Sequence, residues 1–179
     1  MVSLRKASAY SKKKARPFTR KSKSRKKSYI KTIPGMKISK FDMGNQSDYR
    51  KGKHNYNIKL ISKEKIQIRD NALEACRTLL NKQLEREIPG QYYFNIKVYP
   101  HHLLRENKTA AGAGADRLSS GMKHSFGIIV GRAAMVKAGG EILFVSVTNE
   151  RAAHIAKRAM GTVKSKVPCR AKVVFEKVK

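Results

Sequence analysis

The histidines of this chain do not form an evident metal site. His101 and His102 are adjacent. Neighbouring side chains of a strand point to opposite faces, so these two histidines are not expected to coordinate the same metal ion. No carboxylate partner is evident near them, and a structural role or a contact to a nucleic-acid backbone fits the pair better. His54 and His154 stand among cationic or expected solvent-facing positions. The histidine pattern therefore predicts no metal centre.

The other candidate groups for chemistry are equally sparse. Cys76 and Cys169 form no CxxC pair and have no histidine at zinc-finger spacing. Cys76 falls in an apolar stripe, which indicates a small buried residue instead of a nucleophile. Residues 112–117 begin like a GxGxxG motif but lack its third glycine and a preceding buried parallel strand. No Ser-His-Asp order or paired carboxylates stand out. We therefore expect no enzyme activity, no cofactor and no small-molecule substrate.

The charge of the chain points to a polyanionic partner. Its 179 residues carry 41 Lys plus Arg against 12 Asp plus Glu, a net charge of +29, with a pI near 10.5. Such a charge opposes a compact state unless a polyanion neutralises it, and a pI above about 9 is typical of nucleic-acid-binding domains. The length suits one domain. The sequence shows no membrane span and no apolar signal-peptide region, so we expect a cytoplasmic protein without membrane partners.

The positive charge is concentrated at the N-terminus. Fifteen Lys or Arg residues precede Asp42, the first acid. A block of like charge cannot collapse alone, so residues 1–45 are predicted to form a basic arm that follows a nucleic-acid backbone. The aromatic residues Tyr10, Phe18, Tyr29 and Phe41 could stack on bases. A solvated tail or a nuclear-import signal is the alternative. The predicted RNA-binding residues of the arm are Lys12, Lys13, Lys14, Arg16, Arg20, Lys21, Arg25, Lys26 and Lys27.

The elements that must carry these groups follow from hydrophobic periodicity. Strands are predicted at 58–60, 66–68, 92–98, 128–136, 142–147 and 173–178, with an edge strand at 101–105. A helix begins near Asp70 and ends before Pro89-Gly90, and a second begins at 148 or 149 and ends near Gly161. The order predicts an α+β fold, in which two helices pack on a mixed, largely antiparallel sheet within a single globular domain at 46–179.

Each predicted helix has an apolar stripe at helical spacing. The first stripe is Ala72, Ala75, Cys76, Leu79 and Leu80, and the second is Ala152, Ile155, Ala156, Ala159, Met160 and Val163. The opposite face of the second helix carries Arg151, His154 and Arg158. The stripes are expected to face the core and the cationic face to remain in solvent.

A long loop interrupts the domain at residues 107–127. It contains four glycines and few large apolar residues. Loops beyond about 12–15 residues are uncommon in compact domains and are usually functional or disordered. Small residues at 109–115 would let the backbone approach a partner closely, and Lys108, Arg117, Lys123 and His124 supply cations. A surface insertion without a function is the alternative.

Several motifs resemble one family of ribosomal proteins. Residues 113–123, followed by Phe126-Gly127, resemble the AGADRLxxGM…FG signature of the L-ten-e family, the archaeal and eukaryotic counterpart of bacterial protein L-sixteen. Residues 33–35 (IPG) and 41–45 (FDMGN) resemble its N-terminal signature in the archaeal form. Residues 72–75 resemble its first helix, and 105–107 resemble the segment that leads into its loop. The resemblance runs from about Arg16 to near the C-terminus.

The resemblance implies a function and a set of partners. It implies a fold of the α/β-hammerhead type and a structural protein of the large ribosomal subunit that binds large-subunit ribosomal RNA. Other large-subunit proteins are expected as partners. Residues 108–123 would form the family's internal loop, which points toward the peptidyl-transferase region and tRNA acceptor ends. The loop residues expected to act there are Lys108, Thr109, Ala113, Gly114, Ala115, Asp116, Arg117, Gly121, Met122 and Lys123. Further RNA contacts are expected at His102, Arg105, Arg151 and Arg158.

Two departures from the family pattern concern the N-terminus. Residues 21–27 look like an insertion that lengthens the basic arm, and the cysteines of the eukaryotic form are missing from this region. The second departure favours an archaeal origin. Two other functional classes stay open from the residues alone: an architectural protein that compacts DNA, which the arm would fit, and an RNA-modifying enzyme, for which the sequence offers no cofactor or nucleophile signature.

Overall fold

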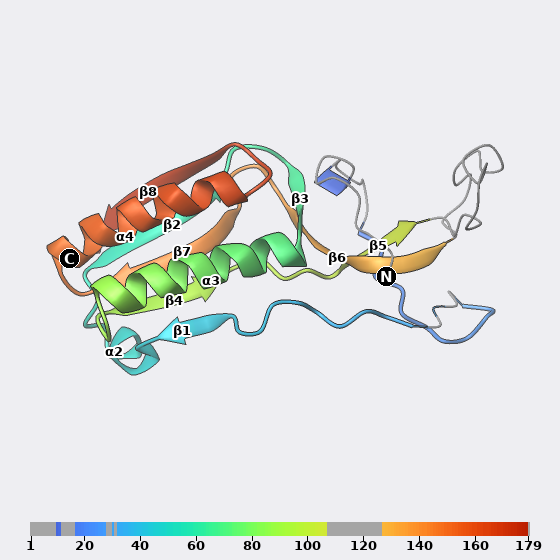
Figure 1. The fold of residues 1–179 in the computed structure, drawn as a ribbon, viewed down its shortest axis with the longest axis horizontal. Coiled ribbons are helices and arrows are strands. Elements are labelled where there is room, and N and C mark those ends of the chain that lie inside the picture. Colours follow the sequence, from blue (N-terminus) through green and yellow to red (C-terminus); the bar gives the residue numbers. More distant parts are fainter. Residues whose placement is uncertain (1–9, 12–16, 28–29, 31, 107–126, 179) are drawn as a thin grey trace.

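The computed structural model describes residues 10–11, 17–27, 30, 32–106 and 127–178 (Figure 1). Within these residues the elements follow one another with short connections, apart from the segment between β5 and β6. In chain order they are β1 (Asp42–Gly44), α2 (Gln46–Arg50), β2 (Tyr56–Ser62), β3 (Ile66–Arg69), α3 (Asp70–Glu87), β4 (Tyr92–Ile96), β5 (His102–Glu106), β6 (Ile128–Val136), β7 (Glu141–Val147), α4 (Glu150–Val163), the 3-10 turn η1 (Lys164–Lys166) and β8 (Ala171–Lys177).

The strands form two antiparallel sheets. The larger has the order β1-β4-β7-β2-β8, and the smaller has the order β3-β6-β5. Helices α3 and α4 lie side by side over one face of the larger sheet (Figure 1). The α+β class with two long helices is therefore confirmed. The largely antiparallel pairing is also confirmed. The expected mixed character is wrong for the described residues, because every strand pair there is antiparallel, and the strands divide between two sheets.

A bend in a shared ladder separates the two sheets. The chain that forms β2 and β3 runs antiparallel to the chain that forms β6 and β7, with Ile61 opposite Glu141 and Ile66 opposite Val136. Between these pairs, the N–H of Gly139 donates to the Ser62 carbonyl at 2.8 Å, and the Ser62 N–H donates to the carbonyl of the next glycine at 3.0 Å. These bonds bridge the bend, so the smaller sheet is an extension of the larger one in a new direction.

The core is built between the helices and the larger sheet. The alternation predicted for the strand at 92–98 is confirmed over β4, where Tyr92, Phe94 and Ile96 are buried. In α3 the observed stripe is rotated from the predicted one, since Ala75 is exposed while the buried apolar residues are Leu73, Cys76, Leu80 and Leu84. Burying the leucines removes more apolar surface from water than burying alanines would. The rotation therefore follows from side-chain size.

Helix α4 follows its predicted stripe closely but ends later than predicted. Its buried residues are Ala152, Ala153, Ala156, Ala159, Met160 and Val163. Gly161 was expected to end the helix, but it lies exposed within α4. A glycine inside a helix costs roughly 1 kcal/mol relative to alanine. Burial of Val163 on the same face offsets that penalty, and the helix continues into η1.

Candidate nucleic-acid interface

The arm is attached to the smaller sheet at Phe18. Its N–H donates to Nδ1 of His102 at 2.7 Å, and its carbonyl accepts from the N–H of Leu103 at 2.9 Å. The guanidinium of Arg105 stands over the Phe18 ring, 3.5 Å from the centroid, and burial lowers the pKa of that guanidinium. His102 is buried and Arg105 half-buried. The structure thus places two predicted RNA contacts against the arm of the protein itself.

The described aromatic residues of the arm also pack on protein. Tyr10 is buried beside Leu104 and Ala133, under the guanidinium of Arg69. The Phe41 ring stacks on Tyr99 with centroids 5.7 Å apart. Together with Phe18, these rings anchor the arm, so their faces are not the free stacking platforms that the sequence suggested. Tyr29 lies outside the described residues.

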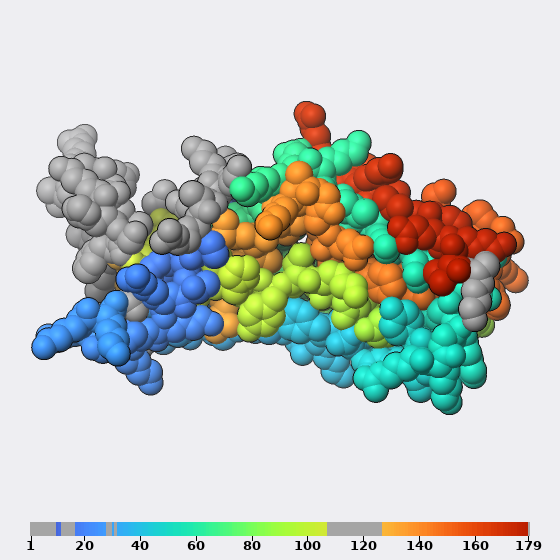
Figure 2. Space-filling view, turned by 180° about the vertical axis from the view of Figure 1, so that it is seen from behind, coloured from blue at the N-terminus to red at the C-terminus, as the bar shows by residue number. Residues whose placement is uncertain are grey.

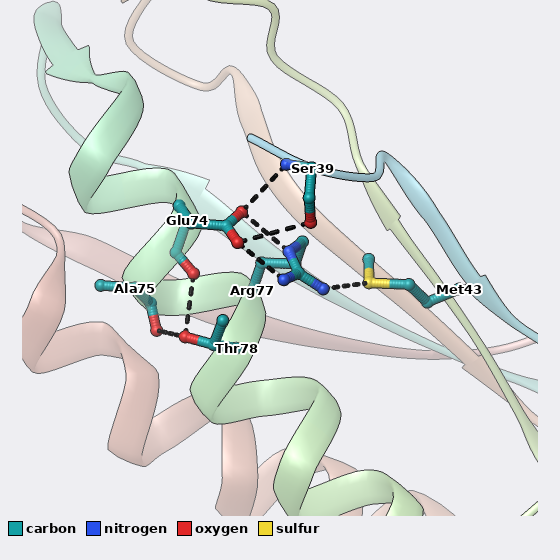
Figure 3. A network of polar contacts seen from close by, with 6 residues as sticks. All are labelled: Ser39, Met43, Glu74, Ala75, Arg77 and Thr78. Atoms are coloured by element: carbon teal, nitrogen blue, oxygen red, sulfur yellow. Dashed lines mark hydrogen bonds and ion pairs between the residues drawn. The ribbon is translucent and has the colours of Figure 1, made fainter. Parts of the chain in front are cut away.

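A polar network fixes the arm to the start of α3 (Figure 3). The carboxylate of Glu74 accepts from the backbone N–H of Ser39 at 3.3 Å and from its hydroxyl at 3.4 Å. The same carboxylate accepts two bonds from Arg77, at 2.7 and 2.8 Å, which hold the pKa of Glu74 below its ordinary value. A third nitrogen contact of Arg77 reaches the sulfur of Met43 at 3.5 Å. One carboxylate therefore joins arm and helix.

The motif at residues 41–45 has a physical explanation in a tight turn. Gly44 has a φ of +83°, and a β-carbon there would overlap the carbonyl oxygen of Tyr92. The next residue, Asn45, donates its backbone N–H to that same oxygen at 2.8 Å. The Asn45 side-chain oxygen accepts from the N–H of Asp48 at 3.1 Å and so caps α2. Glycine and asparagine are both needed for β1 to meet β4 and turn into α2.

Exposed cations concentrate on one described segment of the arm. Residues 17–27 contain no acid, and all six of their Lys and Arg side chains are exposed. The segment turns back on itself, because the Lys27 N–H donates to the Ser24 carbonyl and the Ile30 N–H donates to the Ser22 carbonyl. It lies at the end of the molecule that holds β5 and β6 (Figures 1 and 2). The six residues are Arg20, Lys21, Lys23, Arg25, Lys26 and Lys27. We call them the arm patch.

The acids of the described residues are mostly engaged within the protein. Glu87 pairs with Arg86 and Arg158, and Lys59 holds both Glu141 and Glu176. Further acids with hydrogen-bonded or ionic partners are Asp42, Asp48, Glu64, Asp70, Glu74 and Glu85. With only 12 acids against 41 Lys plus Arg, the surplus of positive charge remains whichever of these pairs form.

The predicted cations on α4 belong to a second surface. Arg151, His154 and Arg158 are exposed, as the helical spacing predicted. Arg158 also donates to Glu87 of α3 at 2.5 Å. Helix α4 covers the larger sheet, whereas the arm patch lies beyond the smaller one (Figure 1). The structure therefore does not gather the predicted RNA-binding residues into one site.

The long loop and part of the arm fall outside the described residues. The predicted arm contacts Lys12, Lys13, Lys14 and Arg16 lie there, as do all the predicted loop residues from Lys108 to Lys123. The base of the loop is described. Glu106 at the end of β5 is paired with Ile128 at the start of β6. Both ends of the loop therefore leave the same end of the β5–β6 strand pair.

Two side chains that could react or titrate, Cys76 and His54, are buried in the core. Burial raises the pKa of Cys76 to about 12, which agrees with its predicted role as a small core residue. His54, expected among cationic or solvent-facing positions, is only 6% exposed. Its ring packs edge-on against Tyr49, a contact that sequence spacing did not reveal. Among the described residues, no three His, Cys, Asp or Glu side chains gather as metal ligands would.

The sequence did not single out two cationic residues that belong to the arm or hold it in place, Lys23 and Arg132. Lys23 shares the exposure of its neighbours in the arm patch but was not singled out. Arg132 donates to the carbonyl of Pro34 at 3.0 Å and guides the arm along β6. The charge run could have identified Lys23. No spacing rule could have paired Arg132 with a residue so distant in sequence. The described residues also contain no helix long and apolar enough to cross a bilayer.

Comparisons of the sequence with known proteins show a family and several relatives. The sequence profile of the family described as "Ribosomal protein L16p/L10e" matches residues 14–174. A "Large ribosomal subunit protein uL16" from Staphylothermus marinus is 44% identical over 177 residues, which covers 98% of this chain and 95% of the relative. Proteins with the same description from Archaeoglobus fulgidus and Methanococcus maripaludis are also 44% identical, over 164 and 177 residues. These alignments cover 90% and 98% of this chain, and 87% and 96% of the respective relatives.

The family match and the archaeal relatives span both the arm and the folded core. The matched residues include Phe18, Gly44 and both ends of the loop. The chain belongs to the ribosomal protein L16p/L10e family.

Proposed function

We propose that this protein is a structural constituent of the large ribosomal subunit and binds its ribosomal RNA. The observation that carries the proposal is the uncompensated charge: +29 overall, with the arm patch exposed and most described acids held within the protein. Ribosomal RNA is a polyanion dense enough to neutralise it. The relatives' description as large-subunit proteins supports the same partner and favours the ribosome over other RNA particles.

Residues 1–45 are proposed to act as the RNA-binding arm of a domain that spans 46–179. The protein anchors this arm at Phe18 and Ser39 and leaves the cations between 20 and 27 in solvent. Anchoring limits the conformations that the arm must lose on binding, while the lysines and arginines stay available for phosphates. Lys12, Lys13, Lys14 and Arg16 extend the same role along the sequence, and Arg151 and Arg158 supply a second RNA contact on α4.

The loop at 107–127 is proposed to reach toward the peptidyl-transferase region and the acceptor ends of tRNA. Its two ends are paired at Glu106 and Ile128, so the loop extends from one hairpin base. The small residues at 109–115 let backbone pass close to RNA, and Lys108, Arg117 and Lys123 add charge. The resemblance of residues 113–123 to the family signature supports this placement.

Sedimentation of native particles tests the main proposal. Particles from the source cells would be washed in high salt, separated, and each fraction measured by quantitative mass spectrometry. Stoichiometric retention on the large subunit supports the proposal, whereas a free pool or sedimentation with chromosomal DNA contradicts it. Subunits that carry a deletion of residues 109–115 test the loop. Normal translation by those subunits would overturn the loop placement but leave the structural role intact.

The alternative is an architectural protein that compacts DNA, since the arm patch carries no base-specific feature. Binding of the full chain to a large-subunit ribosomal RNA and to duplex DNA, measured at the same salt concentration, separates the two. A marked preference for the ribosomal RNA supports the proposed function. Equal affinity, or a preference for the duplex, favours the alternative.

A further inference from the structure

Tyr99 is the most exposed aromatic residue that the structure describes, at 50%. It lies in the segment that joins β4 to β5 (Figure 1). Its ring packs on Phe41, with centroids 5.7 Å apart and the ring planes 23° from parallel. The backbone is held as well, because the Tyr99 carbonyl accepts from the N–H of His101 at 3.0 Å and Pro100 is buried. Tyr99 therefore presents to solvent the ring surface that Phe41 leaves uncovered.

Other aromatic rings on the arm and the sheets are engaged within the protein. Phe18 and Tyr10 lie under arginine side chains, and Tyr49 stacks on Tyr93 with centroids 4.3 Å apart. Tyr99 differs because its ring is supported on one side and accessible on the other. RNA-binding proteins stack unpaired bases on aromatic rings that are presented in this way.

The charge around this ring pair suits a polyanion. Neither chain segment that carries it contains an acid, since residues 1–41 and 88–105 have no Asp or Glu. Lys97 is exposed, and its ammonium lies over an aromatic ring of β7, 4.7 Å from the centroid. Val98 packs on the core, so Lys97 and Tyr99 on either side of it point away from the core. An unpaired nucleotide brings a base for the ring and a phosphate for the ammonium.

An exposed aromatic residue alone calls for no partner. Phe175 on β8, the other exposed aromatic residue that the structure describes, lacks this setting. The residue after it is the acid Glu176, which forms an ion pair with Lys59 at 2.8 Å. Tyr99 combines a stacked support, a cation two residues away and a segment without acids. This combination, more than exposure alone, points to RNA.

We propose that Tyr99 receives one unpaired base of the bound RNA. The base stacks on the ring surface that Phe41 leaves open, and Lys97 meets a phosphate of the same strand. Stacking of this kind tolerates any base, because every base has a π face. The contact lies outside the arm patch, the long loop and α4. This inference rests on the proposed function, because the base belongs to the RNA that the protein binds.

Tryptophan fluorescence tests the proposal at the residue itself. The chain contains no tryptophan, so Tyr99→Trp introduces a single reporter into the full-length protein. The variant is titrated at one salt concentration with an adenosine oligonucleotide and with an abasic ribose-phosphate oligomer of equal charge. The adenosine oligonucleotide is expected to quench the fluorescence saturably by about half through stacking, and the abasic oligomer to leave it unchanged. Equal quenching by both, or quenching by neither, would overturn the proposal.

Matched variants separate this contact from general attraction to RNA. Phe175→Trp places the reporter at the other exposed aromatic position and is expected to remain unquenched; equal quenching there would contradict a specific role of Tyr99. Adding Lys97→Ala to the Tyr99→Trp chain should raise the oligonucleotide concentration at half-quenching about twofold or more. Adding Lys63→Ala, an exposed lysine after β2, should not, and equal effects would contradict the phosphate contact.

The outcomes distinguish this inference from the proposed function. If the chain prefers ribosomal RNA over duplex DNA but the reporter at position 99 fails these tests, only the base-stacking inference falls. If the chain shows no such preference, the proposed function falls.

Discussion

Gly44 is the residue at which the backbone leaves the least choice of side chain. It combines a positive φ with the close approach of the Tyr92 carbonyl. Gly44→Ala is expected to lower the free energy of unfolding by more than about 2 kcal/mol, because a left-handed conformation and a steric overlap add together. Urea denaturation followed by circular dichroism measures the loss.

Gly52 provides a matched control for that experiment. It has a φ of +70°, but a β-carbon there would meet no atom within 4 Å. Gly52→Ala should therefore show the conformational penalty alone, about 1–2 kcal/mol. If both variants lose the same stability, the contact with Tyr92 is not what selects glycine at position 44.

Burial of His54 is expected to make the free energy of unfolding depend on pH. Burial lowers its pKa below the ordinary value of 6.5, and contributions from the Ser146 backbone and Asp48 oppose the shift without cancelling it. The unfolded chain therefore takes up a proton at a pH where the folded chain does not. Stability should be fully present above about pH 6.5 and should be lost as pH falls from 6.5 toward the lowered pKa, by about 1.4 kcal/mol per unit.

The variant His54→Phe removes this titration and keeps a ring against Tyr49. Its free energy of unfolding should be flatter than that of the parent chain between pH 7 and pH 5. His154→Gln, at an exposed position of α4, should retain the parental slope. A parental slope in His54→Phe would assign the pH dependence to other groups.

At the scale of the elements, the contact between the arm and α3 depends on the carboxylate of Glu74. Glu74→Ala removes the acceptor of Ser39 and leaves Arg77 without its ion-pair partner (Figure 3). The expected loss is about 1–2 kcal/mol of unfolding free energy, measured in urea at pH 7. Since the pKa of Glu74 is lowered, the contribution is present above its ordinary value of 4.5 and fades as pH falls below that value. Lys82→Ala, at an exposed position of α3, should change stability little; an equal loss there would refute the assignment.

The predictable parts of the fold are those set by local periodicity. The alternation of Tyr92, Phe94 and Ile96 identified β4, and the spacing of alanines identified the buried face of α4. The helix boundary at Gly161 and the rotation of the α3 stripe depended on tertiary packing, which outweighs propensity. The split into two sheets depends on hydrogen bonds between Ser62 and the turn at Gly139. Such a pairing of distant residues leaves no periodic signal.

The sequence predicted that the candidate interface is positively charged, but it did not predict how the cations are arranged. The run of lysines and arginines before Asp42 identified the arm. Residue type alone could not tell which cations face solvent and which hold the protein together. Arg105 packs on Phe18, and Arg158, although exposed, also pairs with Glu87, and residue type revealed neither contact.

For the whole molecule, the charge distribution predicts how binding responds to salt. Each phosphate contact releases counterions and steepens the fall of log K with log salt by about 0.7–0.9. Replacing the six residues of the arm patch by alanine should therefore reduce the slope for a large-subunit ribosomal RNA fragment by about 4–5 if each contacts a phosphate. Fluorescence anisotropy between 100 and 400 mM KCl measures it.

A control variant distributes the same loss of charge over exposed lysines outside the arm. Its six alanine substitutions replace Lys51, Lys63, Lys82, Lys157, Lys164 and Lys172. Both variants lose six positive charges, so a purely global field would reduce the two slopes equally. A direct role of the arm requires the larger reduction in the arm-patch variant, because only charges that meet phosphates release counterions one for one. Equal slopes would show that the arm contributes net charge alone, and its anchoring at Phe18 and Ser39 would then serve the fold instead of RNA binding.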